Sequence, residues 1–148
     1  MKIMFVCHGN ICRSPMAEAI LRDMAKKRGV SLTVASRATS DEEIRNGVGN
    51  PVYPPAREEL AAHGLSLPGK HSVQLKKSEY GDWDLFIGMD SANIRNMHRI
   101  FGGDPDGKIR RMLPDRDVAD PWYSGKFDVA FRDIYEGCEA LIREMCDI

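Results

Sequence analysis

The stretch CHGNICRSP, residues 7–15, separates two segments of different periodicity. Before it, KIMFV at residues 2–6 is too apolar on both faces for an edge strand and indicates a short buried strand. After it, from about Pro15 to Arg28, apolar side chains recur at helical spacing, and Ser14 is a candidate cap for that helix. The stretch is therefore predicted to link a strand to a helix.

Strands and helices alternate through the rest of the chain. We expect further strands at 32–36, 83–89 and 108–113, helices at 56–63, 91–100 and 127–145, and a long loop from 37 to about 55. This alternation predicts an α/β fold, a single domain over residues 1–148 with a parallel sheet between helices. Ligands bind such folds at the carboxyl ends of the strands, which is where residues 7–15 lie.

The composition is that of an ordinary globular protein. The 148 residues are 43% hydrophobic and 29% charged, with a formal net charge of −1. No overall basic field favours nucleic acid or a membrane as a partner. With four cysteines and no recognisable signal segment, we expect free thiols and a cytoplasmic location. We also expect no cofactor, and a monomer or weak dimer.

The residue types within 7–15 point to an anion site. A loop that enters a helix N-terminus gathers unpaired backbone N–H groups, and the helix dipole adds partial positive charge. Gly9 and Asn10 tolerate the positive φ that a tightly wrapped loop needs, and Arg13 offers a bidentate fork to phosphate oxygens. These donors favour the thiolate form of Cys7. A thiolate, a phosphate cradle and an arginine together predict phosphoryl transfer through a phosphocysteine.

The longer stretch VCHGNICRSPMAE, residues 6–18, resembles the phosphate-binding loop of the low-molecular-weight protein tyrosine phosphatases. That family has the pattern Val-Cys-x-Gly-Asn-Ile-Cys-Arg-Ser-Pro-x-Ala-Glu. The resemblance implies a four-stranded parallel sheet flanked by helices and hydrolysis of phosphotyrosine in protein substrates. It implies that Cys7 is the nucleophile and that Arg13 binds phosphate and stabilises the transition state. The phosphate-binding residues it implies are His8, Gly9, Asn10, Ile11, Cys12, Arg13 and Ser14.

A second stretch, DVADPWYSG at residues 117–125, is similar to the family's other signature, an Asp-Pro followed by aromatic residues. The resemblance implies that Asp120 is the general acid, with Trp122 and Tyr123 beside Ile11 as walls of the phenol slot. A departing tyrosinate needs such an acid because it leaves poorly until it is protonated. Asp104 also precedes a proline, but GGDPDG lacks aromatics and is typical of a turn.

Other positions match the family's supporting residues. The resemblance implies that Asn10 and Ser14 support the loop, with Ser14 hydrogen-bonded to the thiolate. It implies that Ser36 and His71 brace Asn10. Asp90 matches an aspartate that orients the site, and a helix cap is an equal interpretation of that residue.

The sequence departs from the family after the second strand. SRATS stands where the family usually reads Ser-Ala-Gly-Thr, and the loop that commonly supplies an aromatic wall offers Glu42, Glu43, Ile44 and Arg45. We expect substrate stacking to depend on Trp122 and Tyr123, since NPVYPP around Tyr53 is typical of a rigid extended segment. Substrate preference is therefore open at this stage.

Four alternatives remain. Arsenate reductase of the same fold needs two further cysteines in the middle of the chain, and none occurs between Arg13 and Gly137. Protein arginine phosphatases tend to carry Thr where Ile11 stands, and isoleucine favours a flat phenyl ring. A non-catalytic phosphopeptide-binding module is disfavoured because the proposed nucleophile, arginine and acid are all present. A zinc site at Cys7, His8 and Cys12 lacks a second ligand pair, so we expect no metal.

Cys12 is not required for hydrolysis, and packing within the loop is its plain interpretation. Both cysteines belong to one tight loop, so a disulfide between Cys7 and Cys12 is a hypothesis about redox regulation.

Overall fold

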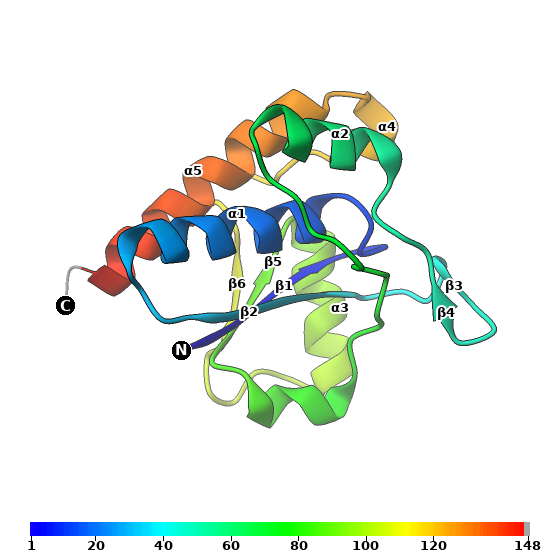
Figure 1. Ribbon diagram of the computed structural model, residues 1–148. Coiled ribbons are helices and arrows are strands. Elements are labelled where there is room, and N and C mark those ends of the chain that lie inside the picture. The colour runs from blue at the N-terminus through cyan, green and yellow to red at the C-terminus, as the bar shows by residue number, and fades with distance from the viewer. Residues whose placement is uncertain (147–148) are drawn as a thin grey trace.

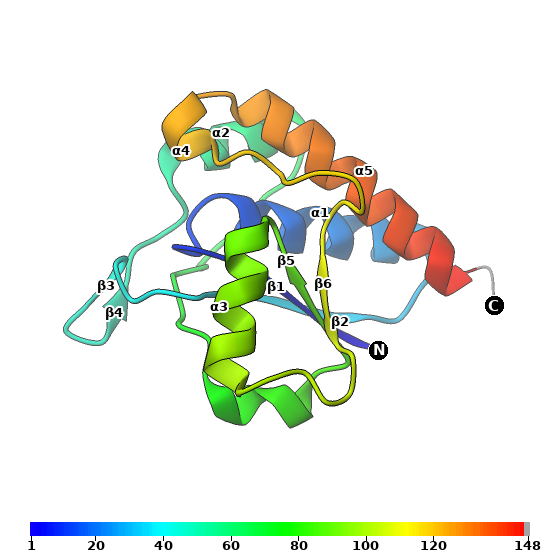
Figure 2. The ribbon, with the colours of Figure 1, turned by 180° about the vertical axis from the view of Figure 1, so that it is seen from behind.

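The computed structural model describes residues 1–146, which fold around a four-stranded parallel sheet (Figures 1 and 2). The strand order is β2-β1-β5-β6, and every neighbouring pair is parallel. The strands are β1 (Lys2–Cys7), β2 (Thr33–Ala38), β5 (Leu85–Gly88) and β6 (Ile109–Arg111). The predicted α/β sheet is confirmed.

Helices cover both faces of the sheet. Figure 1 shows α1 (Arg13–Arg28), α2 (Pro54–Ala62) and α5 (Phe127–Cys146) over one face, with α3 (Ser91–Phe101) and the 3₁₀ helix η1 (Lys77–Asp82) on the other. None of the helices described in residues 1–146 has the length and hydrophobicity that crossing a membrane requires.

The alternation of side chains along β1 divides the core between these two layers. Ile3 and Phe5 pack in the larger cluster beneath α1, α2 and α5, and Met4 and Val6 pack in the smaller cluster with α3. All four are fully buried. Because β1 lies inside the sheet and is covered on both faces, its last residue, Cys7, has a fixed position at the carboxyl edge.

Three elements were not predicted. Residues expected as loop contain a two-stranded antiparallel hairpin, β3 (Ile44–Arg45) with β4 (Val48–Gly49). The helix η1 and the short helix α4 (Pro121–Ser124) are the others. Strands of two residues are too short to show a period in the sequence, which explains why the hairpin was missed.

Helix α1 begins at Arg13, two residues before the predicted start. Cys12 flanks its N-terminus, and no side chain caps it. The prediction that Ser14 is the cap is wrong, because the Ser14 hydroxyl lies inside the helix and bonds the loop before it. The connection from β1 to α1 is therefore only residues 8–12, short enough to wrap around a single point.

Candidate functional site

The loop between β1 and α1 wraps around the sulfur of Cys7. The Asn10 backbone N–H donates to Cys7 Sγ at 3.3 Å, and Ser14 Oγ lies 2.9 Å from the same sulfur. Asn10 adopts a left-handed conformation, φ 58°, and its Nδ2 donates to Ser14 Oγ at 2.8 Å. Cys7 is buried. The positive φ predicted for this loop is confirmed at Asn10 but not at Gly9, whose φ is not positive, and the sulfur of Cys7 is held by Asn10 and Ser14.

Arg13 lies beneath the mouth of the loop and is 3% exposed. Its Nη1 donates to Asp90 Oδ2 at 2.7 Å and to the Val118 carbonyl at 2.8 Å, and its Nη2 is 3.5 Å from Asp120 Oδ2. Burial by itself lowers the pKa of Arg13, but the negative groups Cys7, Asp90 and Asp120 outweigh it and raise that pKa above its ordinary value. The guanidinium is therefore a permanent buried cation.

A slot of about 130 Å³ opens above the loop. It is lined by Cys7, His8, Gly9, Asn10, Ile11, Cys12, Arg13, Glu42, Glu43, Asp120, Trp122 and Tyr123. Ser14 lies behind this lining and reaches the slot through Cys7. The structure thus gathers the expected nucleophile, arginine, acid and aromatic residues at the one place where the strand-to-helix loop meets the segment before α4.

Asp120 is fixed by the helix that it begins. Its Oδ1 accepts a hydrogen bond from the Trp122 backbone N–H at 3.0 Å, and it is the N-terminal cap of α4. Its side chain remains 28% exposed, so a proton on this carboxyl can exchange with water. Trp122 and Tyr123 follow on α4 and are largely exposed.

Tyr53 differs from its expected place. Its ring packs against Trp122 with centroids 4.7 Å apart, and its backbone N–H donates to the Ile11 carbonyl at 2.9 Å. Tyr53 therefore supports the aromatic wall of the slot from behind, where we expected only an extended segment. Glu42 and Glu43 stand at the slot in the region where the family commonly has an aromatic wall.

The bracing of Asn10 is not the one expected. Ser36 Oγ donates to Glu18 Oε1 at 2.6 Å, and the exposed His71 ring bonds the Gly49 carbonyl. Neither side chain bonds Asn10 within residues 1–146, so that prediction is wrong.

Instead, the two residues that follow His71 hold the loop. The Val73 N–H donates to Asn10 Oδ1 at 3.1 Å, and Ser72 Oγ donates to the Gly9 carbonyl at 2.8 Å. Successive residues of an extended segment point to opposite sides, so a side chain next to Ser72 faces away from the loop.

A buried ionic cluster behind the loop was missed entirely. Glu18, 4% exposed, accepts from Ser36 and pairs with Arg22 at 2.8 Å. Lys70 donates to the Ser36 carbonyl at 2.9 Å, with its Nζ 3.9 Å from Glu18. Burial lowers the pKa of Lys70 to about 8, opposed by Glu18 and reinforced by Arg37. Glu18 belongs to the signature stretch, but nothing local in the sequence marks Lys70 as its partner.

The two remaining aspartate predictions are confirmed. Asp90 serves both of its expected purposes, because Oδ1 caps α3 at the Asn93 N–H while Oδ2 accepts from Arg13. Asp104 lies away from the slot and accepts from the backbone N–H groups of Lys108 and Ile109. It is therefore a turn residue.

The other two cysteines lie on α5, as expected. Cys138 is fully buried, its Sγ 3.9 Å from the Ala17 carbonyl, and Cys146 is exposed at the last described turn. Neither lines the slot. Within residues 1–146, no three His, Cys, Asp or Glu side chains are grouped as metal ligands would be.

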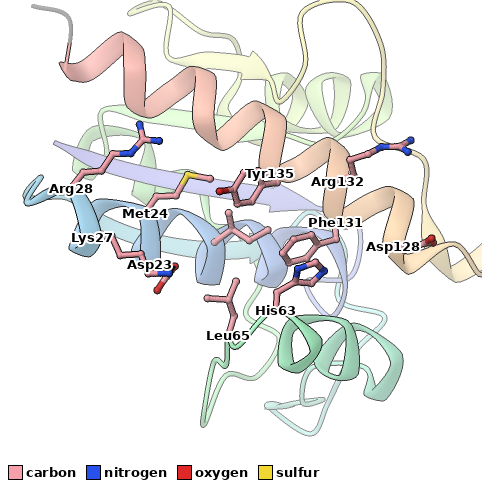
Figure 3. Close-up of a pocket in the computed structure, with 11 residues that line it drawn as sticks. Asp23, Met24, Lys27, Arg28, His63, Leu65, Asp128, Phe131, Arg132 and Tyr135 are labelled. Atoms are coloured by element: carbon pink, nitrogen blue, oxygen red, sulfur yellow. Dashed lines mark ion pairs between the residues drawn. The ribbon is translucent and has the colours of Figure 1, made fainter.

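A larger hollow of about 640 Å³ lies elsewhere, between α1 and α5 (Figure 3). His63 stacks on Phe131 there, with ring centroids 3.8 Å apart, and Asp23 pairs with Lys27 at its edge. Its lining contains no cysteine, serine or threonine that could act as a nucleophile. The residues expected to carry the reaction line the smaller slot, although the other hollow is larger.

Comparison with protein families matches residues 2–147 to the family described as low molecular weight phosphotyrosine protein phosphatase. The low molecular weight protein-tyrosine-phosphatase YfkJ of Bacillus subtilis is 37% identical over 148 residues, covering 95% of this chain and 92% of the relative. The crystal structure of YfkJ superposes with a TM-score of 0.92 at 34% identity, covering 99% of this chain and 95% of the other.

Two further solved structures are similar. SP-PTP, a low molecular weight protein tyrosine phosphatase from Streptococcus pyogenes, has a TM-score of 0.87 at 33% identity, covering 97% of this chain and 91% of its own. DARP, the Drosophila arginine phosphatase, has a TM-score of 0.88 at 28% identity and 98% coverage of both chains. The resemblance first read from residues 6–18 and 117–125 therefore extends along the whole fold.

The buried ammonium of Lys70 predicts a pH-dependent stability. A lysine in an unfolded chain has a pKa near 10.4, well above the folded value of about 8. Between these values the unfolded state binds more protons, so Lys70 makes the free energy of unfolding rise with pH by on the order of 3 kcal/mol. Lys70→Met removes this slope, measured by urea unfolding from pH 7 to 10.

Lys26→Met is the matched control, since Lys26 is exposed on α1. It should follow the wild-type pH dependence. Identical slopes for wild type and Lys70→Met would contradict the assignment.

Proposed function

Because the chain belongs to the low molecular weight phosphotyrosine protein phosphatase family, we propose that it hydrolyses phosphotyrosine in protein substrates through a phosphocysteine intermediate. Cys7 is the nucleophile, Arg13 binds the phosphate, and Asp120 acts first as acid and then as base. One observation carries the proposal: the Cys7 sulfur, the Arg13 guanidinium and the Asp120 carboxyl face a single slot. All three groups come from one chain, which supports a working monomer.

The first step is attack by sulfur on phosphorus. The loop's backbone N–H groups and the positive end of α1 seat the phosphate oxygens. Arg13 has five N–H donors, and Nη1 is occupied by Asp90 and Val118, which leaves Nε and Nη2 for the phosphate. The Cys7 thiolate attacks phosphorus in line with the phenolic oxygen. Asp120, at the slot mouth, gives that oxygen a proton as its bond to phosphorus breaks.

The second step regenerates the thiolate. The Asp120 carboxylate, having lost its proton, takes one from a water molecule that attacks the phosphorus, and the P–S bond breaks. Ser14 Oγ, 2.9 Å from Cys7 Sγ, donates to the departing sulfur and stabilises its negative charge. Asn10 aligns that hydroxyl through its Nδ2.

The slot also supports a phenyl substrate in preference to phosphoarginine. Ile11 and Trp122 present apolar surface to a flat ring, and Tyr53 supports the indole of Trp122. The fold itself does not discriminate, because DARP, named an arginine phosphatase, shares it.

We expect the purified protein to hydrolyse a phosphotyrosine peptide and to leave the matching phosphoarginine peptide intact. Cys7→Ser should abolish turnover but keep phosphate binding, because the hydroxyl is a poor nucleophile in an otherwise intact cradle. Phosphate release measures turnover, and Cys146→Ser is the control that should retain it. Turnover by Cys7→Ser, or a preference for phosphoarginine, would refute the assignment.

Asp120→Asn should slow phosphotyrosine hydrolysis by roughly 10²–10⁴. The loss should be smaller for p-nitrophenyl phosphate, because its more acidic phenol leaves without full protonation. Asp104→Asn, at the other Asp-Pro, should keep kcat near wild type. If Asp120→Asn matches wild type on both substrates, the acid is another group.

We also propose that the enzyme is sensitive to oxidation. We propose that it works in the cytoplasm, where thiols are kept reduced. Peroxide converts the Cys7 thiolate to a sulfenic acid, and the Cys12 thiol displaces water from it to form a disulfide. Burial raises the pKa of Cys12, with Cys7 and Asp120 adding to the effect, so Cys12 stays protonated and is not itself the first target. Detection of the protein in the soluble cytosolic fraction would check its location.

After peroxide treatment, wild-type activity should return on addition of dithiothreitol, because a disulfide is reversible and higher sulfur oxides are not. Cys12→Ser should recover much less. Equal recovery of the two proteins would count against protection by Cys12.

A further inference from the structure

The mouth of the slot is acidic on one side and aromatic on the other. Glu42 and Glu43 face it from the turn after β2, and Trp122 and Tyr123 face it from α4. Among the lining residues the only groups that can carry positive charge are the buried Arg13 and the half-exposed His8. Besides Asp120, the proposed acid, a substrate backbone crossing this mouth therefore meets the carboxylates of Glu42 and Glu43.

The acidic turn is tied directly to the phosphate-binding loop. The Thr39 N–H donates to the Cys7 carbonyl at 2.9 Å. The Ser40 N–H and Oγ both donate to the His8 carbonyl, at 3.1 and 2.9 Å. The Glu42 N–H then donates to Ser40 Oγ at 3.4 Å. Hence the turn keeps one position relative to the nucleophile.

The hairpin beyond the turn holds Glu43 from the other side. Its backbone carbonyl accepts from the Asn50 N–H at 2.8 Å, and its carboxylate accepts from Asn50 Nδ2 at 2.7 Å. The hairpin lies against the segment that braces Asn10, where a Cβ on Gly49 would be 1.9 Å from the Ser72 carbonyl oxygen. Only glycine at position 49 allows the hairpin backbone to approach Ser72 this closely, so the hairpin lies beside the phosphate-binding loop that Ser72 braces.

The two carboxylates differ in how strongly they are held. Glu43 packs over Gly9, where a Cβ would be 3.2 Å from its Cγ, and its charge contributes to the raised pKa of Cys12. Glu42 is 67% exposed and pairs with His8 Nε2 at 3.0 Å. An exposed pair of this kind is weak, so a stronger cation can replace His8 at Glu42.

We propose that Glu42 and Glu43 make the enzyme select phosphotyrosine flanked by lysine or arginine and disfavour acidic flanks. The inference rests on the proposed function, because the phosphate and phenyl groups must occupy the slot for the flanking side chains to reach the mouth. There a basic side chain meets Glu42 and Glu43, while an acidic one is repelled by both. Specificity arises from the unfavourable contact as much as from the favourable one.

The test compares two phosphotyrosine peptides that differ only in their flanks, Lys on both sides or Glu on both sides. Wild-type kcat/KM should favour the Lys peptide about tenfold at low salt, the scale of two exposed ion pairs. In Glu42→Gln/Glu43→Gln the ratio should fall to about twofold or less. In 0.5 M NaCl the wild-type ratio should also shrink, because the Debye length drops below the ~8 Å of physiological salt.

Asp82→Asn/Asp106→Asn is the matched control. It removes the same number of exposed charges near the opposite end of the sheet and should keep the wild-type ratio. The free amino acid phosphotyrosine reports the chemical step without flanks. A wild-type ratio near one, or a ratio unchanged by the Glu42/Glu43 substitutions, would overturn the selectivity while leaving the phosphatase assignment intact.

The two hypotheses fail in different ways. If the wild type hydrolyses neither peptide, the proposed function is wrong. In that case the selectivity is still decided by binding. The affinities for the same two peptides are measured in Cys7→Ser and in Cys7→Ser/Glu42→Gln/Glu43→Gln. Equal affinities would overturn it.

Discussion

The guanidinium of Arg13 is almost fully buried, and a buried cation is stable only when it is paired and hydrogen-bonded. Its partners come from two separate segments: Asp90 at the start of α3, and the stretch that leads into α4, which supplies the Val118 carbonyl and Asp120. Satisfying this one charge therefore requires the N-terminal ends of two helices, α3 and α4, to converge on the loop after β1. The pairing that stabilises the buried arginine also places Asp120, the proposed acid, near Cys7, the proposed nucleophile.

The loop itself is supported by a second, polar layer. Asn10 in its left-handed conformation is held by Ser14 and by the Val73 N–H, and Ser72 holds Gly9. These bonds fix the backbone before any ligand arrives, so the phosphate meets donors that need no reorganisation. Behind them, Glu18 links α1 to β2 through Ser36.

The central features could be predicted because their causes are local. The span from Cys7 to Arg13 is one loop, and Asp120 is marked by the Pro-Trp-Tyr that follows it. The parallel sheet and its flanking helices were predicted from the alternation of strands and helices, and the sheet is confirmed, whereas its strand order is known only from the structure. What escaped depends on contacts between distant segments. Lys70 meets Glu18 across 52 positions of sequence, and Tyr53, at the start of α2, meets Trp122 on α4.

The error at His71 shows why such contacts resist sequence reasoning. The correct segment was identified, but the bonds come from the two residues after His71. Ser72 acts through a side chain that points to the opposite side from that of His71, and Val73 acts through its backbone N–H. A slip of one position in matching a motif reverses the direction in which every side chain faces. Residues 6–18, by contrast, match all eleven specified positions of the family pattern, which allows no slip.

Carboxylates at the mouth of an anion site would weaken phosphate binding by repulsion if both groups acted on the same part of the substrate. They do not, because in the proposed function the phosphate lies inside the loop against Arg13, the N–H groups and the α1 dipole, at short range and largely screened from water. Glu42 is exposed to solvent, where its field decays within about a Debye length. The interior donors therefore determine that a phosphate binds, and the exposed carboxylates act on the side chains beside it. Because the phosphate donors are buried and the carboxylates are exposed, one small slot can bind phosphate in its interior and select among flanking side chains at its mouth.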